Sequence, residues 1–119
     1  MQNFRNLEIW KRSYLFTLKI YKVTALFPVS ENYNLTSQIR RAAVSIPSNI
    51  SEGCAKLSRK DFLRFLEISL GSICELQTQI EICKDLNYIK ENTFSELSKE
   101  LLEIKKMTSS YIFKTRNNL

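Results

Sequence analysis

The sequence predicts an all-α protein, a single domain over residues 1–119 that forms an antiparallel, up-down-up-down bundle of four helices. The chain has 119 residues and 44% hydrophobic composition, which is enough apolar material for one core. Only two glycines and two prolines are present, too few turn formers for the many reversals of a β-sandwich or barrel. Apolar residues recur at helical spacing in four segments, which cover about residues 6–27, 35–54, 58–86 and 93–116.

The first predicted helix (6–27) stops before Pro28, because a residue that precedes proline is disfavoured in the helical conformation. This helix is apolar on two opposite sides. One stripe contains Leu7, Trp10, Tyr14, Leu18 and Tyr21, and the other contains Ile9, Phe16, Ile20, Val23 and Phe27. One bundle core buries only one such face, so we predict that the second stripe forms a subunit interface in a ring-like homo-oligomer. The alternative is that this stripe packs beneath the loop around Pro28 or the C-terminal tail.

The second predicted helix (35–54) contains Pro47, yet the helical spacing of apolar residues continues through it, from Ile39 to Ile50. A proline inside a helix removes one backbone hydrogen bond and crowds the carbonyl four residues earlier, here that of Ala43, at a cost of about 3 kcal/mol. We therefore expect this helix to be bent at Pro47. Gly53, close to its end, is a candidate C-terminal stop.

A polar stripe runs along the same helix and consists of Arg41, Ser45, Asn49 and Glu52. Arg41 and Glu52 lie about three turns apart, roughly 16 Å along the helix axis, so they cannot pair with each other within one subunit. We predict that this stripe joins subunits through hydrogen bonds and an arginine–carboxylate pair. Contact with a ligand or a partner protein is the alternative.

The third helix (58–86) is predicted to begin at Ser58, whose hydroxyl can cap the helix while Asp61 follows three residues later. Asn87 suits the left-handed residue that ends a helix. The fourth helix (93–116) is predicted to open with a second capping box, from Thr93 to Glu96. Heptad spacing in both helices predicts the core positions, and two of these positions are polar, Ser69 and Thr108.

Several segments together resemble one known family. They are Leu7 to Trp10, Ile20-Tyr21, Phe27-Pro28, the whole block from Gln38 to Gly53, Phe65-Leu66 and Gly71-Ser72. With these segments the chain resembles the small four-helix-bundle proteins encoded within intervening sequences of bacterial 23S ribosomal RNA genes, which are also labelled ribosomal-protein-like. The resemblance covers nearly the full length, and the run from Arg40 to Gly53 is its most specific part.

The resemblance implies a four-helix bundle that assembles into a homopentameric ring, in agreement with the doubled apolar face of the first helix. A related branch includes accessory proteins of diversity-generating retroelements, which hold a reverse transcriptase and its RNA template. The expected partners are therefore further copies of the chain, RNA or DNA, and a partner protein.

Charge is distributed unevenly along the chain, whose formal net charge is +6. In an up-down bundle, the starts of the first and third helices and the ends of the second and fourth share one end. We predict a nucleic-acid-binding surface at that end, made of Arg5, Lys11, Arg12, Lys56, Arg59, Lys60, Arg64, Lys105, Lys106, Lys114 and Arg116. The opposite end is predicted to hold Glu75, Glu81, Asp85, Glu91 and Glu96.

Concentrated positive charge attracts phosphate backbones through counterion release and carries no sequence code. The first functional hypothesis is therefore weak, non-specific RNA or DNA binding by the basic end of an oligomer. Its alternative is a solvated surface whose lysines keep the protein soluble. The second hypothesis is an interaction scaffold that docks a partner protein such as a reverse transcriptase, with little nucleic-acid affinity of its own.

We expect no catalytic, cofactor-binding or metal site, and so a protein that is not an enzyme. Histidine is absent, which removes the usual general base and the ligand pairs of di-iron bundles. Three cysteines without C-x-x-C spacing support neither a disulfide framework nor a zinc site. Cys54, near Lys56 and Arg59, is the best candidate nucleophile, but a small buried side chain is the favoured interpretation.

No apolar run approaches the roughly 18 residues of a membrane span, and the N-terminus lacks the pattern of a signal peptide. The expected location is therefore the cytoplasm.

Overall fold

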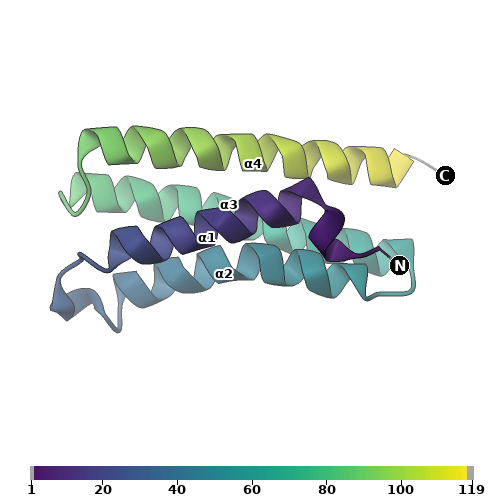
Figure 1. The fold of residues 1–119 in the computed structure, drawn as a ribbon, viewed down its shortest axis with the longest axis horizontal. Coiled ribbons are helices and arrows are strands. Elements are labelled where there is room, and N and C mark those ends of the chain that lie inside the picture. Colours follow the sequence, from purple (N-terminus) through teal and green to yellow (C-terminus); the bar gives the residue numbers. More distant parts are fainter. Residues whose placement is uncertain (1, 118–119) are drawn as a thin grey trace.

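The computed structural model describes residues 2–117, and over these residues the chain contains four α-helices and no β-strand. The helices are α1 (Glu8–Thr24), α2 (Leu35–Cys54), α3 (Arg59–Asp85) and α4 (Glu91–Asn117). Figure 1 shows them lying alongside one another, with the α1–α2 and α3–α4 connections at one end and the α2–α3 connection at the other. The prediction of an all-helical chain with four helices is confirmed for the described part of the chain.

Helix α1 is shorter than the predicted range of 6–27. At its start, Leu7 has an extended backbone (φ −84°, ψ 127°) that separates α1 from a 3-10 turn over Phe4–Asn6. At its end, Arg40 of α2 donates from Nη2 to the carbonyl of Tyr21 at 3.3 Å and from Nε to Oγ1 of Thr24 at 2.8 Å. The Tyr21 carbonyl also accepts from the N–H of Ala25 at 3.1 Å, so Arg40 adds a second donor at the last turn of α1, which ends at Thr24 and not at Pro28.

The two apolar stripes of α1 differ in burial, and the more buried stripe is the one that was predicted to lie at a subunit interface. The stripe predicted to lie at a subunit interface is buried inside the single chain: Ile9, Phe16, Ile20 and Phe27 are at most 7% exposed, and Val23 packs against the same core. The interface assignment of these five residues is therefore wrong. Their side chains carry no polar atoms and suit a dry core, whereas the Tyr14 and Tyr21 hydroxyl groups of the other stripe favour the surface.

Helix α2 runs through Pro47 as one element, and its bounds coincide with the predicted range of 35–54. The carbonyl of Ala43, which Pro47 leaves without a helical donor, accepts a hydrogen bond from the Thr17 hydroxyl of α1 at 3.0 Å. One turn later, the Ser69 hydroxyl of α3 donates to the carbonyl of Ile46 at 2.9 Å. Side chains from both neighbouring helices thus stabilise the proline turn. The bend at Pro47 stays a prediction.

Gly53 does not stop α2, because it lies inside the helix and its φ is not positive. It instead lies close against Phe62 and Phe65 of α3. A Cβ atom at this position would lie 3.0 Å from Cβ of Phe65 and 3.2 Å from Cδ1 of Phe62, so close that these side chains would have to shift by a few tenths of an ångström. Packing against α3, and not the helix terminus, therefore favours a glycine at this position.

The ends of α3 follow the sequence prediction. The Ser58 side chain accepts a hydrogen bond from the backbone N–H of Asp61 at 3.1 Å. Asn87 has a φ of 62°, and the N–H of Tyr88 bonds to the carbonyl of Cys83, the pattern of a left-handed helix end. Both predictions are confirmed.

The capping box predicted at the start of α4 is wrong. Helix α4 begins at Glu91, so Thr93 already lies within its first turn. The predicted core positions of α3 and α4 are buried or half-buried, and Ser69 and Thr108 are fully buried. No helix within the described part of the chain is both long and apolar enough to cross a membrane.

Candidate nucleic-acid-binding corner and assembly face

The cations predicted to bind nucleic acid do not form one continuous surface. Three of them are paired with carboxylates. Lys11 pairs with Glu8 at 3.5 Å, Arg12 with Glu103 at 2.8 Å, and Arg116 with Glu67. These acids come from α1, α3 and α4. The pairs reduce the net charge that the end presents to a phosphate backbone.

Two further members of the predicted set lie away from the end. Lys105 and Lys106 occur near the middle of α4, which spans Glu91–Asn117. The Lys105 ammonium donates to Oε1 of Gln77 on α3 at 3.3 Å. Helix α4 is long, and residues that look C-terminal in the sequence are therefore several turns from its end.

A compact set of cations remains at the connection between α2 and α3, and we call Lys56, Arg59, Lys60 and Arg64 the α2–α3 corner. None of the four takes part in an ion pair with another residue between positions 2 and 117. Two of them rest on one aromatic ring: the Lys56 ammonium lies 4.9 Å and the Arg64 guanidinium 4.7 Å from the ring centre of Phe65. These cation–π contacts hold the two charges in place at the surface.

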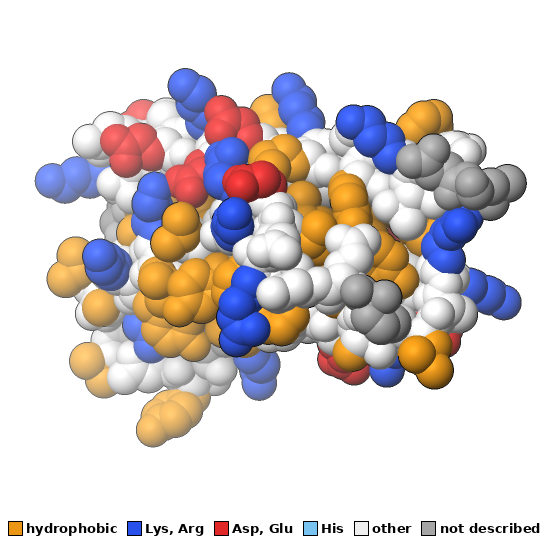
Figure 2. All heavy atoms as spheres, turned by 45° about the vertical axis from the view of Figure 1, so that its right-hand side comes forward, with side chains coloured by type: hydrophobic (Ala, Val, Ile, Leu, Met, Phe, Trp, Pro, Cys, Tyr) orange, Lys and Arg blue, Asp and Glu red, His pale blue; other side chains and the backbone are white. Residues whose placement is uncertain are grey.

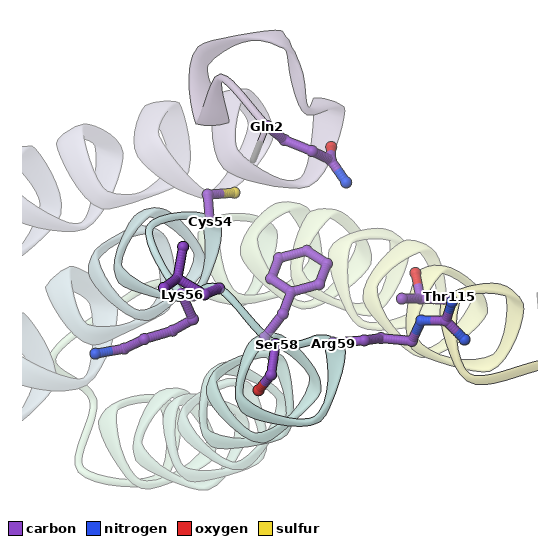
Figure 3. A pocket seen from close by; sticks show the side chains of 9 residues that line it. Gln2, Cys54, Lys56, Ser58, Arg59 and Thr115 are labelled. Atoms are coloured by element: carbon purple, nitrogen blue, oxygen red, sulfur yellow. The ribbon is translucent and has the colours of Figure 1, made fainter. Parts of the chain in front are cut away.

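A pocket of about 220 Å³ opens beside the corner. Its walls come from the N-terminal segment, the end of α2, the start of α3 and the end of α4, and the lining residues are Gln2, Gly53, Cys54, Lys56, Leu57, Ser58, Arg59, Phe62 and Thr115. Figure 3 shows Arg59 extending toward Thr115, whereas Lys56 points away from both. Sequence reasoning had no signal for this pocket, because its walls meet only after the helices pack.

Cys54 lies in this pocket wall but is buried. Burial raises the pKa of the Cys54 thiol above its usual value, since the thiolate is poorly solvated there. The structure therefore favours a small buried side chain over an activated nucleophile. Within residues 2–117 there is also no group of three or more Cys, Asp or Glu side chains that could hold a metal ion.

The outer side of α1 and α2 forms a second surface of interest, which we call the α1–α2 face: Trp10, Tyr14, Leu18, Tyr21 and Val44. The side chains of Tyr14, Leu18 and Tyr21 are 44%, 47% and 42% exposed. Trp10 stacks on Tyr14 with ring centres 5.0 Å apart. Figure 2 shows hydrophobic side chains gathered on the visible side of the molecule, with Lys and Arg side chains around them.

Two adjoining grooves of about 530 and 570 Å³ cross the α1–α2 face. Their described lining includes three arginines, Arg5, Arg40 and Arg41, and no acidic residue. The Arg40 guanidinium lies over the Tyr21 ring, 4.6 Å from its centre. The face is therefore apolar in its middle and positively charged at its edges.

The predicted polar stripe of α2 divides into two parts. Ser45 and Asn49 are half-buried and bonded within the chain: the hydroxyls of Ser45 and Ser72 lie 2.8 Å apart, and Asn49 Nδ2 donates to the Ser45 carbonyl at 2.8 Å. Ser45 joins α2 to α3, and Asn49 bonds within α2. Their assignment to a subunit interface stays a prediction. Arg41 and Glu52 are exposed and free of ion pairs within the described residues.

The arrangement of helices agrees with the comparisons with known proteins. The family model described as 23S rRNA-intervening sequence protein matches residues 5–110. The chain belongs to this family. A solved structure of a protein with unknown function from the S23 ribosomal protein family of Bacteroides thetaiotaomicron is similar, with a TM-score of 0.80 and 27% sequence identity. The similarity covers 87% of this chain and 94% of that one. A search of curated proteins finds no match.

For this member of the 23S rRNA-intervening sequence protein family, the candidate site thus comprises two surfaces. The α2–α3 corner offers unpaired cations next to a pocket, and the α1–α2 face offers exposed aromatic and aliphatic side chains. The first suits an anionic polymer and the second suits another protein surface.

Proposed function

We propose that this protein is a non-enzymatic antiparallel four-helix bundle that binds the RNA or DNA backbone through its α2–α3 corner. The observation that supports this function is the set of four cations at one turn, Lys56, Arg59, Lys60 and Arg64, none paired with a carboxylate within residues 2–117. Each unpaired cation displaces counterions when it meets a phosphate, and this release drives association.

Backbone contacts of this kind position a nucleic acid without reading its bases. The corner belongs to a helix end and a short connection, and it enters no groove by means of a recognition helix. Binding by the corner alone is therefore weak, tolerant of sequence and strongly dependent on salt. The family description refers to an intervening sequence in 23S rRNA, and this supports RNA as the first ligand to test.

The test is the affinity of the purified protein for labelled RNA and DNA, measured by fluorescence anisotropy at several salt concentrations. With four phosphate contacts, log Kd should rise with log salt with a slope of about 3 to 4. The double variant R59Q/K60Q should lower that slope by about 2, because two contacts are lost. The matched control K22Q/K99Q removes the same charge from exposed positions elsewhere and should leave the slope nearly unchanged.

Two results would contradict this function. One is the absence of binding at low salt, and the other is an equal loss of affinity in R59Q/K60Q and K22Q/K99Q. The second result would mean that net charge alone attracts the nucleic acid and that the corner has no special part.

We further propose that the protein self-associates through the α1–α2 face. The exposed Tyr14, Leu18 and Tyr21 support this, since contiguous apolar patches rarely stay in contact with water. The arginines at the edges of the face attract acidic partners, and on a second copy the exposed Glu75, Glu91 and Glu96 of α3 and α4 can supply them; Glu81 and Asp85 are exposed too but pair with Lys84. A contact between two different faces is heterologous. Repetition of this contact gives a closed ring when the rotation between neighbouring subunits divides a full turn evenly.

The resemblance to ring-forming bundle proteins makes a homopentamer the expected closed form. The alternative function is an interaction scaffold, in which the same α1–α2 face docks a partner protein such as a reverse transcriptase. The neighbourhood of the gene separates these functions: a position inside a ribosomal RNA gene favours the first, and an adjacent reverse transcriptase favours the second.

A further inference from the structure

The pocket beside the α2–α3 corner has a different chemistry from the corner itself. It combines an aromatic ring and three uncharged polar side chains with one lysine and one arginine, within about 220 Å³. We propose that this pocket receives one unpaired nucleobase of the bound strand, so that the protein prefers single-stranded nucleic acid. This inference rests on the proposed backbone binding and names the class of nucleic acid that the site takes.

The Phe62 ring supplies the apolar surface for the base. Phe62 is 9% exposed and lines the pocket. Its ring is held between neighbours, since Tyr111 meets it edge-on with ring centres 6.2 Å apart, and Gly53 lies against it on α2. An aromatic ring that is fixed before binding loses little entropy when a base packs on it. Unstacked bases of single strands are commonly bound against such rings.

Three polar side chains in the pocket wall retain hydrogen-bonding capacity for the edge of a base. Gln2 donates from Nε2 to the Tyr111 hydroxyl at 2.8 Å, which leaves its carbonyl oxygen as an acceptor. The Ser58 oxygen accepts from the N–H of Asp61, which leaves its hydroxyl proton to donate. Figure 3 shows that Gln2 and Thr115 come from separate segments, whereas the Ser58 hydroxyl points away from both; all three residues line the pocket. A base edge needs both donors and acceptors, and the wall contains both.

The pocket and the α2–α3 corner share two residues, Lys56 and Arg59. Arg59 has Lys60 next to it in the sequence. A nucleotide whose base enters the pocket therefore places its phosphate close to these charges. A base in a duplex reaches the pocket only after it is unpaired and unstacked, which costs a few kcal/mol. The same contacts thus favour a single strand over a duplex.

The experiment compares three labelled ligands of equal length: a single-stranded RNA, an abasic strand with the same backbone, and an RNA duplex. Fluorescence anisotropy with the wild-type protein should give an affinity for the single strand roughly tenfold higher than for the abasic strand, as expected for one stacked base. The abasic strand reports the backbone contribution alone.

The variant T115F places a larger side chain in the pocket and leaves every corner cation in place. It should lower the affinity for the single strand to that of the abasic strand and leave the affinity for the abasic strand and the duplex unchanged. The matched control is S109F, at an exposed position of the same helix, which should retain the tenfold preference. Q2A, at an exposed residue of the pocket wall, should reduce the preference without loss of thermal stability.

Equal wild-type affinities for the single and abasic strands, both dependent on salt, would overturn the base pocket and leave the proposed backbone binding intact. If T115F retained the preference for the single strand over the abasic strand, the base would not bind in this pocket. No binding of any ligand would instead overturn the proposed function itself. If circular dichroism shows that T115F does not fold, two measurements still test the base pocket: the wild-type affinities for the single and abasic strands, and the loss of preference in Q2A.

Discussion

The Thr17 hydroxyl lies 3.0 Å from the carbonyl oxygen of Ala43. In a regular helix this carbonyl would accept a hydrogen bond from the N–H of residue 47, but Pro47 has no N–H. Thr17 is 8% exposed, and its proton is also within reach of the Ser13 carbonyl at 2.8 Å. A residue on α1 therefore completes the backbone hydrogen bonding of α2. The proline is tolerated at this position because the neighbouring helix supplies the missing donor.

Replacement of Thr17 by valine keeps the shape of the side chain and removes the donor. We expect T17V to lower the free energy of unfolding by about 1–2 kcal/mol, because a buried carbonyl loses its partner. Urea unfolding followed by circular dichroism measures this change. The control T78V removes an exposed hydroxyl that bonds only within its own helix, and it should cost much less.

A double-mutant cycle with P47A separates this hydrogen bond from general packing. Alanine restores the backbone N–H that bonds to the Ala43 carbonyl, so T17V should cost less in the P47A background. Equal costs in the two backgrounds would show that Thr17 does not compensate for the proline.

The two glycines should respond in opposite ways to alanine. G53A introduces a Cβ atom 3.0 Å from Cβ of Phe65 and should lower the free energy of unfolding by about 1–2 kcal/mol, despite the better helix propensity of alanine. In G71A the new Cβ atom has no neighbour within 4 Å, so this variant should raise the free energy of unfolding by about 0.5–1 kcal/mol. Urea unfolding of the two variants checks both signs. A stabilising effect of G53A would mean that α2 and α3 approach less closely than described.

The proposed self-association predicts a mass above that of one chain in light scattering at micromolar concentration. L18D places a charge in the middle of the α1–α2 face and should shift the protein toward the monomer. The control L102D changes a similarly exposed leucine, 42% against 47%, on α4. A monomeric wild type, or dissociation by L102D alone, would contradict assembly through the α1–α2 face.

Thiol reactivity should distinguish the three cysteines. Cys74 is exposed, whereas Cys54 and Cys83 are buried. Burial, with the nearby Glu31 carboxylate, raises the pKa of Cys83 from its usual 9.0 to about 11, so it carries almost no thiolate at pH 8. A thiol reagent such as DTNB should therefore modify one cysteine per native chain at pH 8 and three after unfolding. Rapid modification of all three thiols in the native state would contradict this burial.

The raised pKa of Cys83 also predicts a pH dependence. The folded state holds the thiol proton to higher pH than the unfolded chain, so stability is retained below pH 9 and is lost as the pH rises toward about 11. The free energy of unfolding should fall by up to about 1.4 kcal/mol per pH unit in this window from this group. The slope should be smaller in C83A, which lacks the group. An equal slope in both proteins would assign the loss to other residues.

Local patterns in the sequence determined most of the helices. The bounds of α2, the Ser58 cap and the left-handed Asn87 depend on neighbouring residues along the chain, and the sequence alone predicted all three. The α2–α3 corner was also predictable, since Lys56, Arg59, Lys60 and Arg64 lie within one short stretch. Local conformation and local charge require no knowledge of distant contacts.

The tertiary structure decided which face of α1 is buried and which cations remain unpaired. Both stripes of α1 have helical spacing, so the spacing alone did not show that Phe16 lies inside and Leu18 outside. Arg12 meets Glu103, 91 positions later, and the pocket beside the corner is built from four separate segments. Such features depend on long-range packing, because the burial and the ion pairs of a side chain are set by residues that are distant in the sequence and become neighbours only in the folded chain.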